Sequence, residues 1–190
     1  MCWVLVVDGD GVTLVDTGYP GDEERVIASL GKIARSRADV DAVVLTRAHP
    51  DHIGSAEYFR SQQGKPVREH ERRSEATGEQ TERVAVPTLL TMSWRPSVLV
   101  FVLTGIGLTA AQDHRLGDVD SYTDSAVDVP GHPLPIHTPG YTSRHAALHL
   151  PDQGALVAGD ALMAEHALAT SAHPSEAFAR AFCKSKEVLR

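Results

Sequence analysis

Residues 43–55 constrain the fold and the chemistry of this chain more than any other stretch. The stretch opens with an apolar run typical of a buried strand, and it leads directly into a loop that holds His49, Asp51 and His52. A proline and a glycine keep that loop separate from the strand before it and the helix after it. Such a loop can direct two imidazoles and a carboxylate at one point, as a metal ion requires. A short histidine spacing alone is more often a solvated polar turn.

Two later motifs favour a metal site. The sequence His-Thr-Pro-Gly at 137–140 and the pair Gly159-Asp160 each follow a strand-like run. Because the ends of neighbouring strands meet at one edge of a sheet, we expect both motifs to lie beside the first cluster.

Local patterns predict that strands and helices alternate along the chain. Apolar runs at 2–7 and 12–16 flank an Asp-Gly-Asp-Gly sequence that suits a tight hairpin turn. A strand is predicted at 40–46, and a second hairpin at 145–158. The predicted helices are one with an apolar stripe of Val26, Ile27, Leu30 and Ile33, one at 55–63 that ends at Gly64, and a C-terminal one from 176 onward.

The region after the second predicted helix becomes charged and polar. Residues 69–83 show no sustained period, so we expect an exposed loop or a solvated helix there, with His70 as a surface histidine.

The sequence resembles the metallo-β-lactamase superfamily, whose motifs read Thr-His-x-His-x-Asp-His, His-Thr-Pro-Gly-His and Gly-Asp. Residues 46–52, 137–141 and 159–160 match these motifs in the same order, and Asp16-Thr17-Gly18 matches an early Asp-Thr-Gly. The resemblance implies an α/β fold, a four-layer αβ/βα sandwich formed by a single domain of residues 1–190. Both ends look short against the family pattern, so we expect incomplete outer strands. A segment at about 67–126 is expected to be an insertion or to cover the pocket.

The resemblance also implies two metal positions. The implied ligand positions are Arg47, His49 and Tyr141 for the first ion, Asp51 and His52 for the second, and Asp160 for both. Arginine stays protonated and cannot bind zinc, and a phenol is a poor ligand at neutral pH. Arg47 and Tyr141 are therefore altered ligand positions. We expect one zinc ion rather than two, with an empty site as the alternative.

The other site residues follow from the same resemblance. Asp51 is the expected catalytic residue, which would position or deprotonate the attacking water. Asp16 and His145 are expected to support the ligands from behind, with the equal alternative for Asp16 that it stabilises a turn by bonding its own loop. His166 and His173 could supply the last histidine of the family pattern, although each is more often a surface residue.

Composition limits the partners. The 190 residues carry a formal net charge of −7, which gives no basic footprint for nucleic acid or an anionic membrane. The two cysteines lie near opposite ends, and no signal peptide is recognisable, so we expect a cytoplasmic protein. A small-molecule substrate is the expected partner. Unpaired sheet edges at the short ends would favour a homo-oligomer.

Two function classes remain open. The first is a metal-dependent hydrolase that acts on an ester, thioester, lactone or related small substrate. The second is a degenerate member of the same fold, with a weakened or empty metal site, that serves as a binding or structural module.

Overall fold

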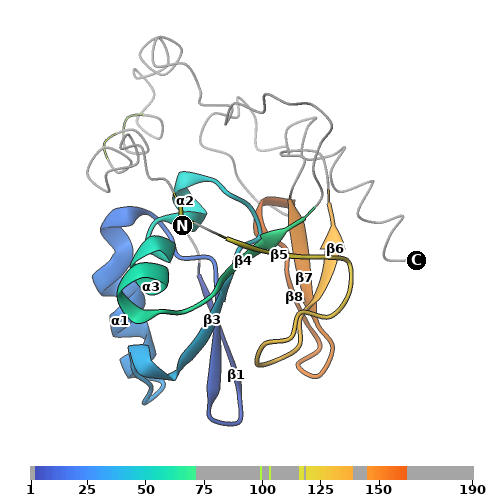
Figure 1. Cartoon of the computed structure of the whole chain (residues 1–190), viewed down its shortest axis with the longest axis horizontal. Helices are drawn as coiled ribbons and strands as arrows, with labels where there is room; N and C mark the ends of the chain where they lie inside the picture. The colour runs from blue at the N-terminus through green and yellow to red at the C-terminus, as the bar shows by residue number, and fades with distance from the viewer. Residues whose placement is uncertain are drawn as a thin grey trace.

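The structure is a computed structural model, and it describes residues 3–71, 99, 103, 116–117, 119–138 and 145–161. The strands of the described residues form two sheets that face each other (Figure 1). In chain order the elements are β1 (Val4–Asp8), β2 (Gly11–Val15), η1 (Pro20–Asp22), α1 (Glu23–Lys32), η2 (Arg37–Asp39), β3 (Val40–Val44), α2 (Pro50–Ile53), α3 (Ala56–Gln63), β4 (Val67–His70), β5 (Asp120–Tyr122), β6 (Leu134–His137), β7 (Ala146–Leu150), β8 (Ala155–Val157) and η3 (Gly159–Ala161).

The larger sheet has the strand order β1-β2-β3-β4-β5. β1 and β2 form the predicted antiparallel hairpin, and Gly9 supplies the left-handed conformation (φ +57°) that its turn needs. The other neighbouring strands are parallel, so β2, β3 and β4 end at the same edge. Both faces of β3 are covered, which explains its nearly continuous run of valine and alanine.

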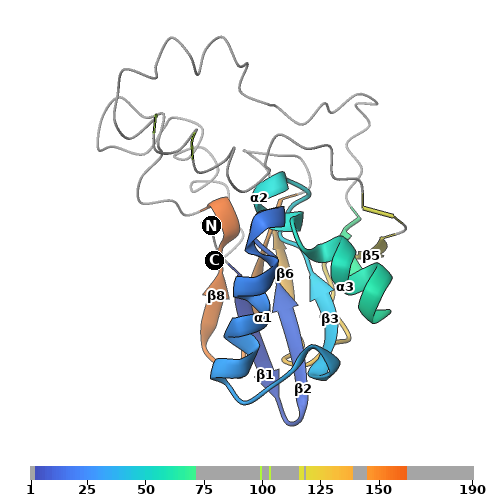
Figure 2. The ribbon, with the colours of Figure 1, turned by 90° about the vertical axis from the view of Figure 1, so that its left-hand side faces the viewer.

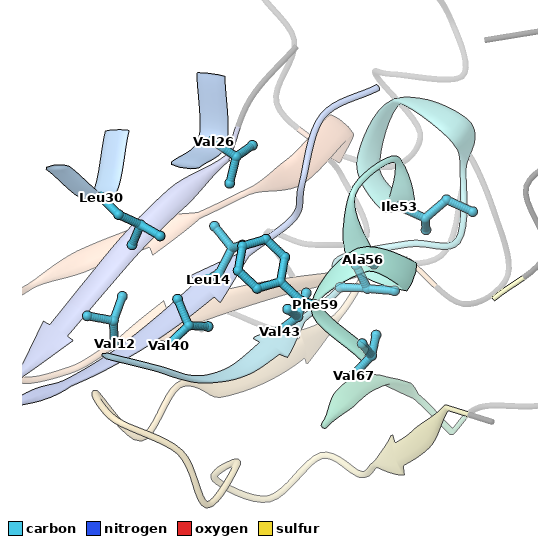
Figure 3. Packing of buried hydrophobic residues seen from close by; sticks show 11 residues of the cluster. Val12, Leu14, Val26, Leu30, Val40, Val43, Ile53, Ala56, Phe59 and Val67 are labelled. Atoms are coloured by element: carbon cyan, nitrogen blue, oxygen red, sulfur yellow. The ribbon is translucent and has the colours of Figure 1, made fainter. Parts of the chain in front are cut away.

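Helices α1 and α3 cover the outer face of the larger sheet (Figure 2). Val26 and Leu30 of α1 and Phe59 of α3 form one buried cluster with Leu14 and Val43 of the sheet (Figure 3). Burying a side chain of this size contributes about 1.5–3 kcal/mol. The cluster fixes α3, and with it the short α2 segment that precedes it, over the ends of the strands.

The smaller sheet has the strand order β6-β7-β8 and is antiparallel throughout. It packs on the inner face of the larger sheet through a second buried cluster that includes Val44 and Leu148. A main-chain hydrogen bond from Ala146 N–H to the Thr46 carbonyl (3.0 Å) joins the two sheets beside this cluster. The described residues thus form three layers: the helices, the larger sheet and the smaller sheet. The helix predicted from 176 onward lies outside them.

The segment from 67 onward differs from the expectation. Residues 67–70 form β4, so residues 69 and 70 belong to a strand and not to the exposed segment expected at 69–83. β5 at 120–122 pairs beside β4, so both ends of the expected insertion belong to the larger sheet. His70 was expected at the surface, but it is only 2% exposed. The pairing of β4 with a strand that follows much later in the chain buries this histidine. Apart from a few positions, residues 72–118 lie outside the described ones.

The helices end close to the predicted positions. α3 ends before Gly64, which adopts the left-handed conformation (φ +62°) common at helix ends. α1 ends at Lys32. Ile33 was expected in the buried apolar stripe of this helix, but it follows the helix and is 40% exposed. Among the described residues, no helix is long and apolar enough to cross a membrane.

Candidate metal centre

The candidate site lies where β2 and β3 end, at the short helix α2, which carries Asp51 and His52. The loop of residues 16–18 follows β2 and is bonded to α2. Thr17 N–H and the Thr17 hydroxyl both donate to the His52 carbonyl, at 2.7 and 2.9 Å. Gly54 N–H donates to the Gly18 carbonyl at 2.8 Å. These bonds hold the backbone of His52 against the end of β2.

Gly54 is required by this close approach. A Cβ atom at this position would lie 2.0 Å from the carbonyl carbon of Tyr19 and 2.4 Å from the oxygen of Gly18. Any side chain would therefore push the two loops apart. The glycine that separates the ligand loop from α3 in the sequence is thus part of the site's scaffold.

Asp16 orients His52. One Asp16 oxygen accepts from Thr46 N–H (2.9 Å), and the other accepts from the Thr46 hydroxyl (2.7 Å) and from His52 Nδ1 (2.8 Å). Because a carboxylate can only accept, the Nδ1 atom of His52 carries a proton. The other ring nitrogen, Nε2, then faces the cluster. A carboxylate behind a histidine in this way is the usual support for a metal ligand, so the expected role of Asp16 fits its position.

Three ligand atoms converge in front of His52. Its Nε2 atom lies 3.6 Å from Asp51 Oδ2 and 3.5 Å from Asp160 Oδ1, and ligand atoms of the three residues all lie within 4.8 Å of one another. Two ligands bound about 2.1 Å from a tetrahedral zinc ion are about 3.4 Å apart. The spacing of these residues therefore fits one divalent ion. Three protein ligands are also the number found in catalytic zinc sites.

The charges around His52 match this geometry. Burial alone would lower the pKa of His52, but hydrogen bonds to Asp16 and Asp160 outweigh it and raise that pKa to about 10. Burial would raise the pKa of Asp51, but the hydrogen bond from His49 and the charges of His52 and Arg47 hold it well below its usual range. The carboxylates thus stay ionised and draw a positive charge to the position of Nε2.

Arg47 joins two of the three candidate ligands. Its Nη2 atom lies 2.5 Å from Asp160 Oδ2 and 3.3 Å from each oxygen of Asp51. The side chain is almost fully buried. The altered first-ligand position is thus filled by a guanidinium that turns inward to the cluster and not out to solvent.

His49 lies beside Asp51. Its Nδ1 atom lies 3.2 Å from Asp51 Oδ1, and the residue precedes the first turn of α2. It is not part of the group of three whose ligand atoms converge. The His49 ring thus contacts Asp51 directly before α2. Its expected role as a ligand of the first ion stays a prediction, because Tyr141, another residue of that position, lies outside the described residues.

His145 positions Asp160. Its Nε2 atom accepts from Asp160 N–H at 3.0 Å, so the proton of the neutral ring is on Nδ1, which lies 2.5 Å from the Thr138 hydroxyl oxygen. Burial, together with the charge of Arg47, lowers the pKa of His145 to about 4. Gly159 has φ +52°, and a Cβ there would lie 2.6 Å from His145 Nε2. The supporting role expected for His145 agrees with these contacts.

Sequence reasoning missed Thr46 and Thr138, which hold Asp16 and His145. Each threonine lies within or beside a recognised motif, but nothing in the sequence pairs it with a residue in another loop. Tyr141, His166 and His173 lie outside the described residues.

Comparisons with known proteins agree with the fold. The family model described as the metallo-beta-lactamase superfamily matches residues 1–183. Among solved structures, a metallo-β-lactamase family protein from Thermus thermophilus is similar over 96% of this chain and 62% of its own, with 26% identity and a TM-score of 0.62. This chain therefore spans less than two thirds of that protein's length.

Two further structures are similar at lower identity and so bear on the fold alone. A protein solved in a di-iron-bound form matches 96% of this chain and 79% of its own, with 20% identity and a TM-score of 0.56. The native FEZ-1 metallo-β-lactamase from Legionella gormanii matches 97% and 67%, with 18% identity and a TM-score of 0.55. A search of curated proteins gave no match. The family match over nearly the whole length, together with the two facing sheets, shows that this chain belongs to the metallo-β-lactamase superfamily.

Proposed function

We propose that the chain is a metal-dependent hydrolase that holds one zinc ion through Asp51, His52 and Asp160 and acts on an ester, thioester, lactone or related small substrate. The observation that carries this proposal is the convergence of three ligand atoms at the spacing of a tetrahedral ion, with His52 oriented from behind by Asp16. A structural neighbour was solved with two irons, so iron is the alternative metal to test.

The chemistry divides between the ion and the side chains. A bound divalent ion lowers the pKa of water toward neutrality and polarises a carbonyl oxygen. His52 would hold the ion through Nε2 because Asp16 fixes the proton on Nδ1. The Asp51 side chain is 26% exposed and that of Asp160 17%, so the carboxylates border solvent while His52 is buried behind them. Asp51 can therefore hold a water molecule and accept its proton.

The substrate is proposed from charge. The formal net charge of −7 disfavours a polyanion such as nucleic acid and leaves small molecules as the better class. An ester or lactone carbonyl needs only the ion and one proton acceptor, which this site supplies.

One observation favours a second function, a binding or structural module without hydrolysis. Arg47 bonds both Asp51 and Asp160 and neutralises part of the charge that would attract a metal ion. If the Arg47 guanidinium balances the charge of Asp51 and Asp160 without a metal ion, the protein would hold almost no metal.

Metal content separates the two functions. We expect protein purified without added zinc to contain about one equivalent of zinc or iron, and we expect it to hydrolyse 4-nitrophenyl acetate or a simple thioester or lactone. A chelator should abolish the activity, and zinc should restore it. His52→Gln should lose both metal and activity, whereas His149→Gln, a half-buried histidine of β7, should keep both. Protein without metal that gains no activity with zinc would favour the module.

A further inference from the structure

The guanidinium of Arg47 lies at the centre of the carboxylate cluster. One nitrogen atom, Nη2, contacts Asp160 Oδ2 at 2.5 Å and both Asp51 oxygens at 3.3 Å. The two oxygens of Asp160 therefore have different partners, since Oδ1 faces His52 and Oδ2 faces Arg47. Only one of them is directed toward the ion proposed above.

The charges of the site indicate how many ions it can take. Asp16, Asp51 and Asp160 carry three negative charges, and Arg47 carries one positive charge that it cannot lose. Two negative charges remain when His52 is a neutral ligand, and one divalent ion cancels them. A second divalent ion would leave an excess of positive charge in a partly buried site, where charge is poorly screened.

We propose that the Arg47 guanidinium takes the place of a second metal ion, so that the centre binds a single divalent ion and keeps Asp51 and Asp160 in position when that ion is absent. This inference rests on the proposed metal site, but it does not depend on the proposed reaction. A guanidinium suits the role because its rigid, planar group can contact two carboxylates at once.

The first test counts ions. The wild-type protein, saturated with zinc chloride and dialysed, should retain one equivalent. Arg47→His removes the fixed charge and supplies an imidazole near His49 and Asp160, so it should retain two. Arg60→Gln serves as a control because Arg60 forms a bidentate pair with Glu57 on the surface of α3, and it should retain one. Two ions in the wild-type protein would overturn the inference. A folded Arg47→His protein that still binds one would show that Arg47 does not set the number.

The second test measures the melting temperature of the metal-free protein. Arg47→Gln leaves the partly buried carboxylates of Asp51 and Asp160 without the guanidinium, so it should melt several degrees lower, and zinc should raise its melting temperature more than that of the wild type. Arg47→Lys keeps the charge and should fall between the two, which gives a folded variant if the glutamine does not fold. Equal melting temperatures for Arg47→Gln, Arg60→Gln and the wild type would refute the role of Arg47.

The two proposals fail in different ways. A protein that binds one ion and responds to both tests, yet hydrolyses no substrate, refutes the hydrolase and leaves the role of Arg47 standing. A protein that hydrolyses substrate with two bound ions refutes the role of Arg47 alone.

Discussion

Replacing Asp16 by asparagine should weaken zinc binding without removing any of the three proposed ligands. One Asp16 oxygen accepts from Thr46 N–H, and the other accepts from the Thr46 hydroxyl and from His52 Nδ1. An amide has a single oxygen. If that oxygen faces Thr46 N–H, the NH₂ group faces His52 Nδ1, and the ring proton must move to Nε2, where the ion binds. If the oxygen instead faces His52 Nδ1, the NH₂ group faces Thr46 N–H. Two donors then meet, and that hydrogen bond is lost.

The magnitude follows from these contacts. Either arrangement loses at least one hydrogen bond to a charged group, which costs about 1.5–3 kcal/mol of stability. Loss of the carboxylate behind a metal-bound histidine typically weakens metal affinity by about 10–100-fold. Asp16 has φ +56°, a conformation that asparagine also tolerates, so the substitution adds no backbone strain.

Isothermal titration with zinc chloride measures the affinity, and urea denaturation measures the stability. Asp152→Asn makes the same chemical change in the exposed turn between β7 and β8, and it should leave both values unchanged. If Asp16→Asn bound one zinc ion with the affinity of the wild type, the hydrogen bond from His52 to Asp16 would not control which ring nitrogen is free, and the assignment of Nε2 as the ligand would be wrong.

Three further predictions concern the scaffold. Gly54→Ala should destabilise the protein by at least about 3 kcal/mol because its Cβ would lie 2.0 Å from a backbone atom of Tyr19. Gly31→Ala in α1 has open space around the new Cβ and should instead stabilise the protein by about 0.5–1 kcal/mol. Chemical denaturation of both variants measures these changes. Tyr122→Phe should cost about 0.5–1.5 kcal/mol, measured in the same way, because the buried phenol donates to a main-chain carbonyl at 2.8 Å. Burial and nearby carboxylates raise the pKa of Tyr19 to about 12, so the contribution of Tyr19 to stability should be constant below pH 10, its unfolded value, and should be lost between pH 10 and 12 as the unfolded chain loses this proton first. Melting curves of Tyr19→Phe should show a shallower fall, and an equally steep one would contradict the assignment.

Local chemistry explains which parts of the fold could be predicted. The Asp-Gly turn, the apolar stripe before Lys32 and the helix end at Gly64 depend on neighbouring residues, so their patterns are visible in the sequence. His70 could not be placed in this way. Its surroundings in the sequence are charged, but β4 pairs with β5, and the His70 ring bonds Asp124 and stacks on His137. The burial of His70 results from strand pairing between distant parts of the chain, so it cannot be predicted from the neighbouring residues.

The site shows the same division. The motifs indicated that Asp51, His52 and Asp160 would meet, because each follows the end of a strand. The direction of each side chain was not predictable. The His49 ring lies against Asp51, and that depends on where the backbone turns into α2. The inward direction of Arg47 depends on Asp160, which lies on a distant part of the chain.

The spread of the ligands along the chain sets the order in which a newly made protein can acquire its ion. Asp16 directly follows β2, and His52 lies on α2, 36 positions later, so this half of the centre can form while translation continues. Asp160 comes only after β8, and at ordinary elongation rates its synthesis follows that of His52 by about 5–20 s. During that interval the nascent chain presents only Asp51 and His52 of the three proposed ligands. If the ion needs all three, the protein can retain it only after the smaller sheet has brought Asp160 beside them, so the ion would complete the fold and not direct it.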